Sequence, residues 1–200
     1  EAEWRLFVAL PLAGDVRALV GGVVAEIQPH GWPARWSGAD SAHVTLHFLG
    51  GVAPERAQLL RMALPAVVRQ HEPFKLRTTD LGAFPDVMKP RVLWLGLAGE
   101  THRLTALSAS VAKVLRSLDM EADDRPLRPH ITLGRVRDDP PADLAAKIRR
   151  GLDDPSLRDR LARDAAPVVV DEIVLYRSIL ERDGTRHEAL VRCPLRSAGS

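Results

Sequence analysis

The chain has 200 residues, of which 46% are hydrophobic and 27% are charged, and its formal net charge at pH 7 is +2. No apolar run approaches the roughly 18 residues that read as a membrane-spanning helix, and the basic-then-apolar pattern of a secretory signal is missing, so we expect no membrane association. A lone cysteine, Cys193, cannot form an internal disulfide, which favours a reducing, cytoplasmic compartment. This length suits one domain, residues 1–200, or two intimate lobes of it.

The spacing of apolar residues predicts an alternation of strands and helices without a linker. In chain order we expect a strand at residues 4–10, a helix at 15–28, a strand around 43–46, a helix at 54–71, strands at 74–81 and 91–97, a helix at 101–118, a strand around 130–133, a helix at 142–152, and strands at 168–176 and 186–192. One of these helices begins with Pro54 and another follows Pro140 and Pro141, because proline prefers the first helical turn. The alternation indicates a mixed α and β protein, and the two similar strands suggest an internal duplication.

The tetrapeptide His-x-Thr-Leu occurs twice, as residues 43–46 and again as residues 130–133. Each copy lies in a β-branched, apolar run that predicts a strand. Side chains two apart on a strand share one face, so His43 lies beside Thr45 and His130 beside Thr132, while the intervening residues point to the core. The sequence therefore predicts two matching polar faces.

Two histidines and two threonines facing each other across a cleft are suited to metal-free phosphodiester cleavage. One neutral imidazole can accept a proton from an attacking water while the other, protonated, donates one to the leaving oxygen. Threonine hydroxyls can hold the phosphate oxygens where charge develops. A zinc site is the alternative, because His43 and His47 share a face of an ideal strand and His130 could join them; each His-x-Thr could also be an ordinary half-buried strand.

The motifs and their surroundings resemble the two-histidine phosphoesterases, and within them the bacterial and archaeal RNA 2′,3′-cyclic phosphodiesterases, formerly called 2′-5′ RNA ligases. Similar segments cover nearly the whole chain in the family's order: residues 5–10, 43–50, 90–96, 129–136 and 175–178. The resemblance implies an α+β fold of two pseudo-symmetric lobes. Each lobe would be an antiparallel sheet with helices on its outer face, carrying one motif, and a central cleft would separate the two.

The same resemblance implies hydrolysis of a terminal RNA 2′,3′-cyclic phosphate to a 2′-phosphate, with no metal and no nucleotide cofactor. It makes His43 the proton donor to the O3′ leaving group and His130 the proton acceptor from water. Thr45 and Thr132 would bind the phosphate oxygens. Arg135, five residues after the second histidine, would also bind the substrate, provided that the strand twists or bulges after Gly134.

Two other functions remain open for these residues. One is 2′-5′ RNA ligation or cleavage by the same side chains, and the other is a non-catalytic module that binds RNA ends. The expected partner in each case is RNA with a 2′,3′-cyclic phosphate end, attracted by a basic rim around the second motif, and we expect a monomer. Aromatic residues could stack the terminal base, although Phe48 and Trp94 are expected in the core.

Overall fold

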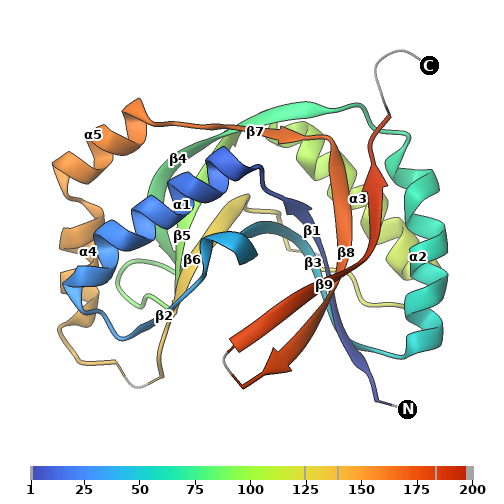
Figure 1. Cartoon of the computed structure of the whole chain (residues 1–200), viewed down its shortest axis with the longest axis horizontal. Helices are drawn as coiled ribbons and strands as arrows, with labels where there is room; N and C mark the ends of the chain where they lie inside the picture. The colour runs from blue at the N-terminus through green and yellow to red at the C-terminus, as the bar shows by residue number, and fades with distance from the viewer. Residues whose placement is uncertain (1, 124, 139, 183, 197–200) are drawn as a thin grey trace.

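The computed structural model describes residues 2–123, 125–138, 140–182 and 184–196 as two antiparallel sheets with helices on their outer sides (Figure 1). The first sheet has the strand order β3 (His43–Val52), β1 (Trp4–Pro11), β8 (Glu172–Glu181) and β9 (Gly184–Pro194). The second has the order β2 (Ala34–Trp36), β6 (His130–Val136), β5 (Val92–Gly99), β4 (Phe74–Phe84) and β7 (Pro167–Val170). The predicted α+β fold with two lobes is confirmed.

The helices divide between the two lobes. In Figure 1, α2 (Pro54–Val68) and α3 (Thr101–Ser117) lie beside the first sheet, and α1 (Gly14–Ile27), α4 (Leu144–Leu152) and α5 (Pro155–Arg163) gather on the second. Helix α1 follows a strand of the first sheet yet reaches the second lobe, where Glu26 pairs with Arg160 of α5 at 2.7 Å. Two single-turn 3₁₀ helices, η1 (Gln28–His30) and η2 (Ala39–Ser41), complete the described elements. None of the helices in the described ranges has the length and hydrophobicity that crossing a membrane requires.

Three elements differ from the sequence prediction. The segment expected as one strand, residues 168–176, is interrupted at Asp171, so that β7 joins the second sheet and β8 the first. Helix α5 was not predicted; it begins at Pro155 and is capped by the Asp154 carboxylate, which accepts from the Ser156 N–H at 2.8 Å. Strand β2 has only three residues, too few for a periodic signal.

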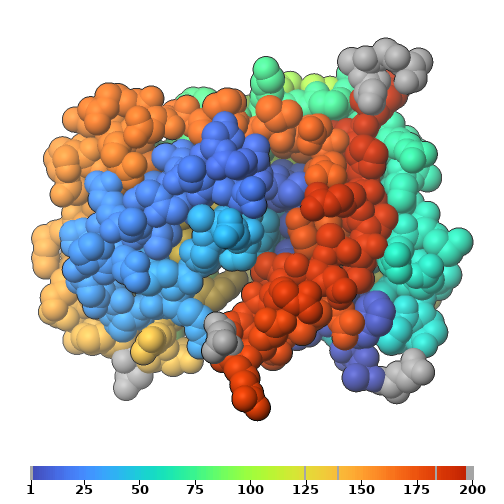
Figure 2. All heavy atoms as spheres, viewed as in Figure 1, coloured from blue at the N-terminus to red at the C-terminus, as the bar shows by residue number. Residues whose placement is uncertain are grey.

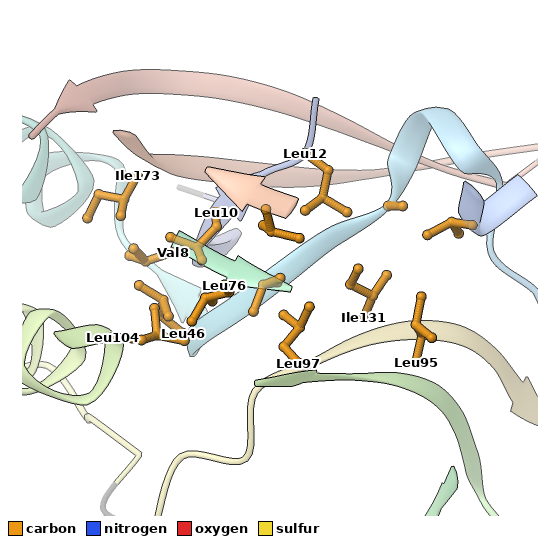
Figure 3. Close-up of a cluster of buried hydrophobic side chains, with 14 of the residues drawn as sticks. Val8, Leu10, Leu12, Leu46, Leu76, Leu95, Leu97, Leu104, Ile131 and Ile173 are labelled. Carbon is orange, nitrogen blue, oxygen red and sulfur yellow. The ribbon is translucent and has the colours of Figure 1, made fainter. Parts of the chain in front are cut away.

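One hydrophobic cluster joins the two sheets. It includes Val8, Leu10 and Leu46 from the first sheet together with Leu95 and Ile131 from the second, and Figure 3 shows these side chains in one continuous region. The motif strands β3 and β6 contact each other directly. This shared core fixes the two polar strand faces relative to each other.

Candidate active site

The first motif lies at the start of β3, where the strand leaves the η2 turn. His43 and Thr45 are half-buried on one face, and Val44 and Leu46 are buried on the other. The Nδ1 atom of His43 lies 2.7 Å from the Ser41 carbonyl oxygen. Because a carbonyl oxygen only accepts, Nδ1 carries the proton and Nε2 is left for chemistry.

The second motif repeats this arrangement on β6. His130 and Thr132 are half-buried, Ile131 and Leu133 are buried, and His130 Nδ1 donates to the Arg128 carbonyl oxygen at 2.6 Å. In both copies the acceptor is two residues before the histidine. The paired imidazoles therefore have the same tautomer, and no partner binds the Thr45 or Thr132 hydroxyl among the residues that the structure describes.

A β-bulge lies at the leucine that ends each motif. On β3 the register with β1 shifts so that Thr45 lies opposite Ala9 and His47 opposite Val8, which makes Leu46 the extra residue. On β6 the register with β5 shifts between Thr132 and Gly134, which makes Leu133 the extra residue. Each bulge reverses the alternation of side chains beyond it.

The bulge at Leu133 turns Arg135 to the side of His130 and Thr132. The prediction required a bulge after Gly134, and the observed one lies just before it. The charge of Arg135 contributes to lowering the pKa of both His43 and His130, which places its guanidinium near both rings. The irregularity that the prediction required is thus present one position earlier than expected, and the substrate-binding role of Arg135 stays a prediction.

The bulge at Leu46 overturns two expectations for β3. His47 does not share the face of His43: it is 2% exposed, and its Nε2 lies 3.0 Å from the Ser108 carbonyl oxygen of α3. The three-histidine zinc alternative is therefore wrong, and among the described residues no other group of His, Cys, Asp or Glu could hold a metal. Phe48, expected in the core, is 60% exposed on the cleft side.

Burial lowers the pKa of both motif histidines and so favours their neutral forms in the free protein. It lowers the pKa of His43 from 6.5 to about 4, with further lowering by the nearby His187, Arg135 and His130, while the bond to Ser41 acts in the opposite direction. Burial likewise lowers the pKa of His130, again with a contribution from Arg135. An anion bound between the rings would raise both values.

Aromatic residues surround each histidine. The Phe7 ring of β1 packs 4.9 Å from His43 and 4.9 Å from His187 of β9. The Phe84 ring packs edge-on against His130 at 4.8 Å and lies 5.2 Å from Trp94, which pairs with Thr132 and is half-buried, not in the core. His187 was assigned no role from the sequence, because no threonine motif accompanies it; only its strand pairing could have placed it here.

A cavity of about 540 Å³ opens beside His130 and Thr45. Phe48, Phe84 and Leu127 give it apolar walls, and Arg128 stacks on Phe84 with its guanidinium carbon 4.6 Å from the ring centre. Arg91 and Arg125 also line this cavity, and each is ion-paired, Arg91 with Asp138 at 3.4 Å and Arg125 with Asp123 at 2.6 Å. The arrangement can bind a planar ring next to an anionic group.

Comparisons with known proteins agree with this geometry. An RNA 2′,3′-cyclic phosphodiesterase of Thermotoga maritima is 28% identical over 189 residues, 94% of each chain. One of Archaeoglobus fulgidus is 34% identical over 145 residues, 72% of this chain and 80% of the relative. The crystal structure of E. coli LigT complexed with 3′-AMP has a TM-score of 0.71 and 26% identity, covering 98% of this chain and 100% of that one.

A family model described as the 2′-5′ RNA ligase superfamily matches residues 17–181, a range that contains both motifs. The match confirms the resemblance on which the sequence interpretation depended. The chain belongs to this superfamily, the two-histidine phosphoesterases.

Proposed function

We propose that this protein hydrolyses the terminal 2′,3′-cyclic phosphate of RNA to a 2′-phosphate by acid–base catalysis with His43 and His130 and without a metal. The observation that carries the proposal is the matched pair of imidazoles. In each, Nδ1 is bound to a backbone carbonyl, and Nε2 has no hydrogen-bond partner among the described residues. The names of the relatives point to the same substrate.

The reaction is a single displacement at phosphorus. His130 Nε2 accepts a proton from water as the water oxygen bonds to phosphorus, and the bond from phosphorus to O3′ breaks. His43 Nε2 donates a proton to O3′, which leaves as a hydroxyl on the same ribose. Solvent then returns a proton to His43 and removes one from His130.

The phosphate would be held by three groups that carry no catalytic proton. The Thr45 and Thr132 hydroxyls are placed beside the two histidines on their strands and donate to the non-bridging oxygens. Arg135 supplies two parallel N–H donors, a geometry that suits a phosphate. Charge that develops on these oxygens is thereby stabilised.

The terminal base would occupy the apolar cavity beside His130. Phe48 offers an exposed ring, and Arg128 stacked on Phe84 offers a second planar surface. RNA-binding proteins commonly hold unpaired bases between such surfaces. The expected partner is therefore a single-stranded RNA end.

Substrate binding would allow His43 to carry the proton that it donates as the acid. In the free protein the low pKa of His43 leaves its ring neutral at pH 7, so it cannot donate. The negative charge of the bound phosphate favours the imidazolium form and raises this pKa. Catalysis thus requires an anionic substrate between the rings.

The test is incubation of the purified protein, in a chelator, with a short RNA ending in a 2′,3′-cyclic phosphate, followed by identification of the end product. We expect a 2′-phosphate from the wild type and none from the double variant His43→Ala, His130→Ala. The double variant His71→Ala, His102→Ala is the matched control. Activity that survives loss of both motif histidines, or that the chelator abolishes, would refute the proposal.

A further inference from the structure

A second cavity, of about 500 Å³, opens beside His43 between the η2 segment and the first sheet. Figure 2 shows this face hollowed between the cyan segment that contains η2 and the red β8–β9 hairpin. His187 of β9 lines the cavity together with His43 and Tyr176. The proposed reaction uses only His43 of these three residues, so the place of His187 beside it is unexplained.

His187 is held in the first sheet with its ring against His43. Its backbone pairs with Ser178 of β8, and its Nδ1 atom lies 3.5 Å from the Ser178 hydroxyl oxygen. The His187 ring stands at 89° to the His43 ring, with 5.4 Å between the two ring centres. Phe7 packs 4.9 Å from each of them, so the three rings form one cluster. Contacts between perpendicular rings are attractive and depend on orientation.

The other motif histidine has a neighbour of the same kind. The Phe84 ring stands at 83° to the His130 ring, with 4.8 Å between their centres. Each motif histidine therefore combines a hydrogen bond from Nδ1 to a carbonyl with a perpendicular ring from another strand. The hydrogen bond fixes the tautomer but lets the imidazole tilt about the bond, and the perpendicular ring limits this tilt. The direction of Nε2 is thereby fixed, as proton transfer requires.

The surroundings of His187 favour its neutral form. Asp171 and the ion pair between Glu172 and Arg192 line the same cavity, but within the described ranges none of them makes a hydrogen bond or ion pair with His187. Burial lowers the pKa of His187. A neutral ring at this place can pack against His43 without repelling the proton that His43 takes up when the substrate binds.

We propose that His187 is a positioning residue for His43, a proposal that rests on the acid role of His43 in the proposed function. The His187 ring holds His43 Nε2 in the direction of the O3′ leaving group and exchanges no proton itself. Without this ring, His43 would tilt toward the second cavity and donate its proton less efficiently. Proton transfer to O3′ is therefore the one step that depends on His187.

The experiment measures kcat at saturating substrate for two cyclic phosphates that differ in one atom, an ordinary one and one with sulfur in place of O3′. A leaving thiolate needs no proton, so the sulfur substrate removes the step on which His187 acts. His187→Ala deletes the ring, whereas His187→Phe keeps an aromatic ring without a titratable nitrogen. His71→Ala, half-buried and in a separate cavity, is the matched control, and His43→Ala is the reference for loss of the acid.

We expect His187→Ala to lower kcat about 3- to 10-fold on the oxygen substrate, the loss that corresponds to one perpendicular ring contact, and less than about 2-fold on the sulfur substrate. His187→Phe and His71→Ala should stay within about 2-fold of the wild type on both substrates. Equal losses on the two substrates would show a merely structural role and overturn the proposal. An unchanged kcat in His187→Ala overturns it too, as does a loss that His187→Phe fails to restore.

The reference variant separates this proposal from the proposed function. If sulfur restores the activity of His43→Ala, His43 is the acid, and the His187 variants then decide the positioning role alone. If sulfur does not restore it, the acid role of His43 and the positioning role of His187 both fall. Absence of wild-type turnover on both substrates overturns the proposed function as a whole. Urea unfolding followed by tryptophan fluorescence checks that each variant is folded under the assay conditions.

Discussion

Each motif histidine is oriented by its own backbone, because the carbonyl that accepts from Nδ1 belongs to the residue two positions earlier. This local bond fixes the tautomer without a carboxylate. The two rings therefore have the same tautomer but different surroundings. His43 is the more buried of the two and has His187 beside it. Their surroundings alone would give them separate roles.

Substitution of one atom in the substrate distinguishes the acid from the base. His43→Ala should lower kcat by about 10²- to 10⁴-fold on an ordinary cyclic phosphate, and so should His130→Ala. When sulfur replaces O3′, the leaving thiolate needs no proton, so His43→Ala should recover most of its activity and His130→Ala should not. Recovery by His130→Ala alone would exchange the two roles, and recovery by neither would contradict acid catalysis at this position.

The low pKa of His43 predicts a loss of stability in acid. Between its ordinary pKa of 6.5 and the native value of about 4, the unfolded chain binds a proton that the native histidine does not. The free energy of unfolding therefore rises with pH across this window and falls on acidification. One such proton corresponds to a slope of up to about 1.4 kcal/mol per pH unit.

Urea titrations between pH 4 and pH 7 measure this slope. His43→Gln should reduce it, and His102→Gln, at an exposed position on α3, should leave it unchanged. Part of the slope should remain in every variant, because the pKa is also lowered for three other histidines, His71, His130 and His187. An identical slope in wild type and His43→Gln would mean that His43 titrates normally.

At the scale of the element, the bulges decide which side chains enter the cleft. Strict alternation predicted His43, Thr45, His130 and Thr132 correctly, because all four precede the bulges. The same rule failed for His47 and Phe48, which follow one. A single sequence gives no signal for the extra residue here, because it does not show that the polar His47 is buried next to Leu46 through a hydrogen bond to Ser108.

The equivalent positions after the two bulges are Phe48 and Arg135, one aromatic and one cationic. We expect Phe48→Ala to lower kcat/KM for a cyclic nucleotide by roughly 5- to 150-fold, the loss of about 1–3 kcal/mol of base stacking. Because the ring is 60% exposed, the free energy of unfolding should change by less than about 0.5 kcal/mol. Met62→Ala, 71% exposed on α2, is the control that should alter neither quantity.

We expect His47 to contribute to the fold and not to the chemistry. Its side chain joins β3 to α3 through the Ser108 carbonyl and hydroxyl oxygens. His47→Leu should lower the free energy of unfolding by about 1–3 kcal/mol, measured in urea, with kcat within a few-fold of wild type. His102→Leu on α3 is the matched control, and a large loss of kcat at full stability would assign His47 to the active site.

At the scale of the whole molecule, the arrangement of the sheets followed from the family resemblance and not from periodicity. Hydrophobic patterns located most helices and strands, but they cannot say which sheet a strand joins. The segment around Asp171 is the clearest case, because its apolar run is continuous in sequence while β7 and β8 pair with different sheets. Contacts between residues far apart in the sequence determine which sheet each of these strands joins.

The core shared by the two lobes predicts that they unfold together. Buried side chains of both sheets form one cluster, so neither lobe keeps its core when the other unfolds. Tryptophan fluorescence of a Trp4→Phe variant reports on the second lobe through Trp32, Trp36 and Trp94. Thiol labelling of Cys193, buried in β9, reports on the first. We expect the two urea midpoints to coincide.

A core substitution tests the same coupling from one side. Ile131 is fully buried in β6 and belongs to the shared cluster, so Ile131→Ala should lower the free energy of unfolding by about 2–5 kcal/mol. Both probes should report the same shift, although the substitution lies in the second sheet. Val169→Ala, 49% exposed on β7, should shift neither midpoint appreciably. If the midpoint of thiol labelling stayed at its wild-type value while the fluorescence midpoint fell, the two lobes would be independent. A cleft between independent lobes could not hold His43 and His130 at a fixed separation.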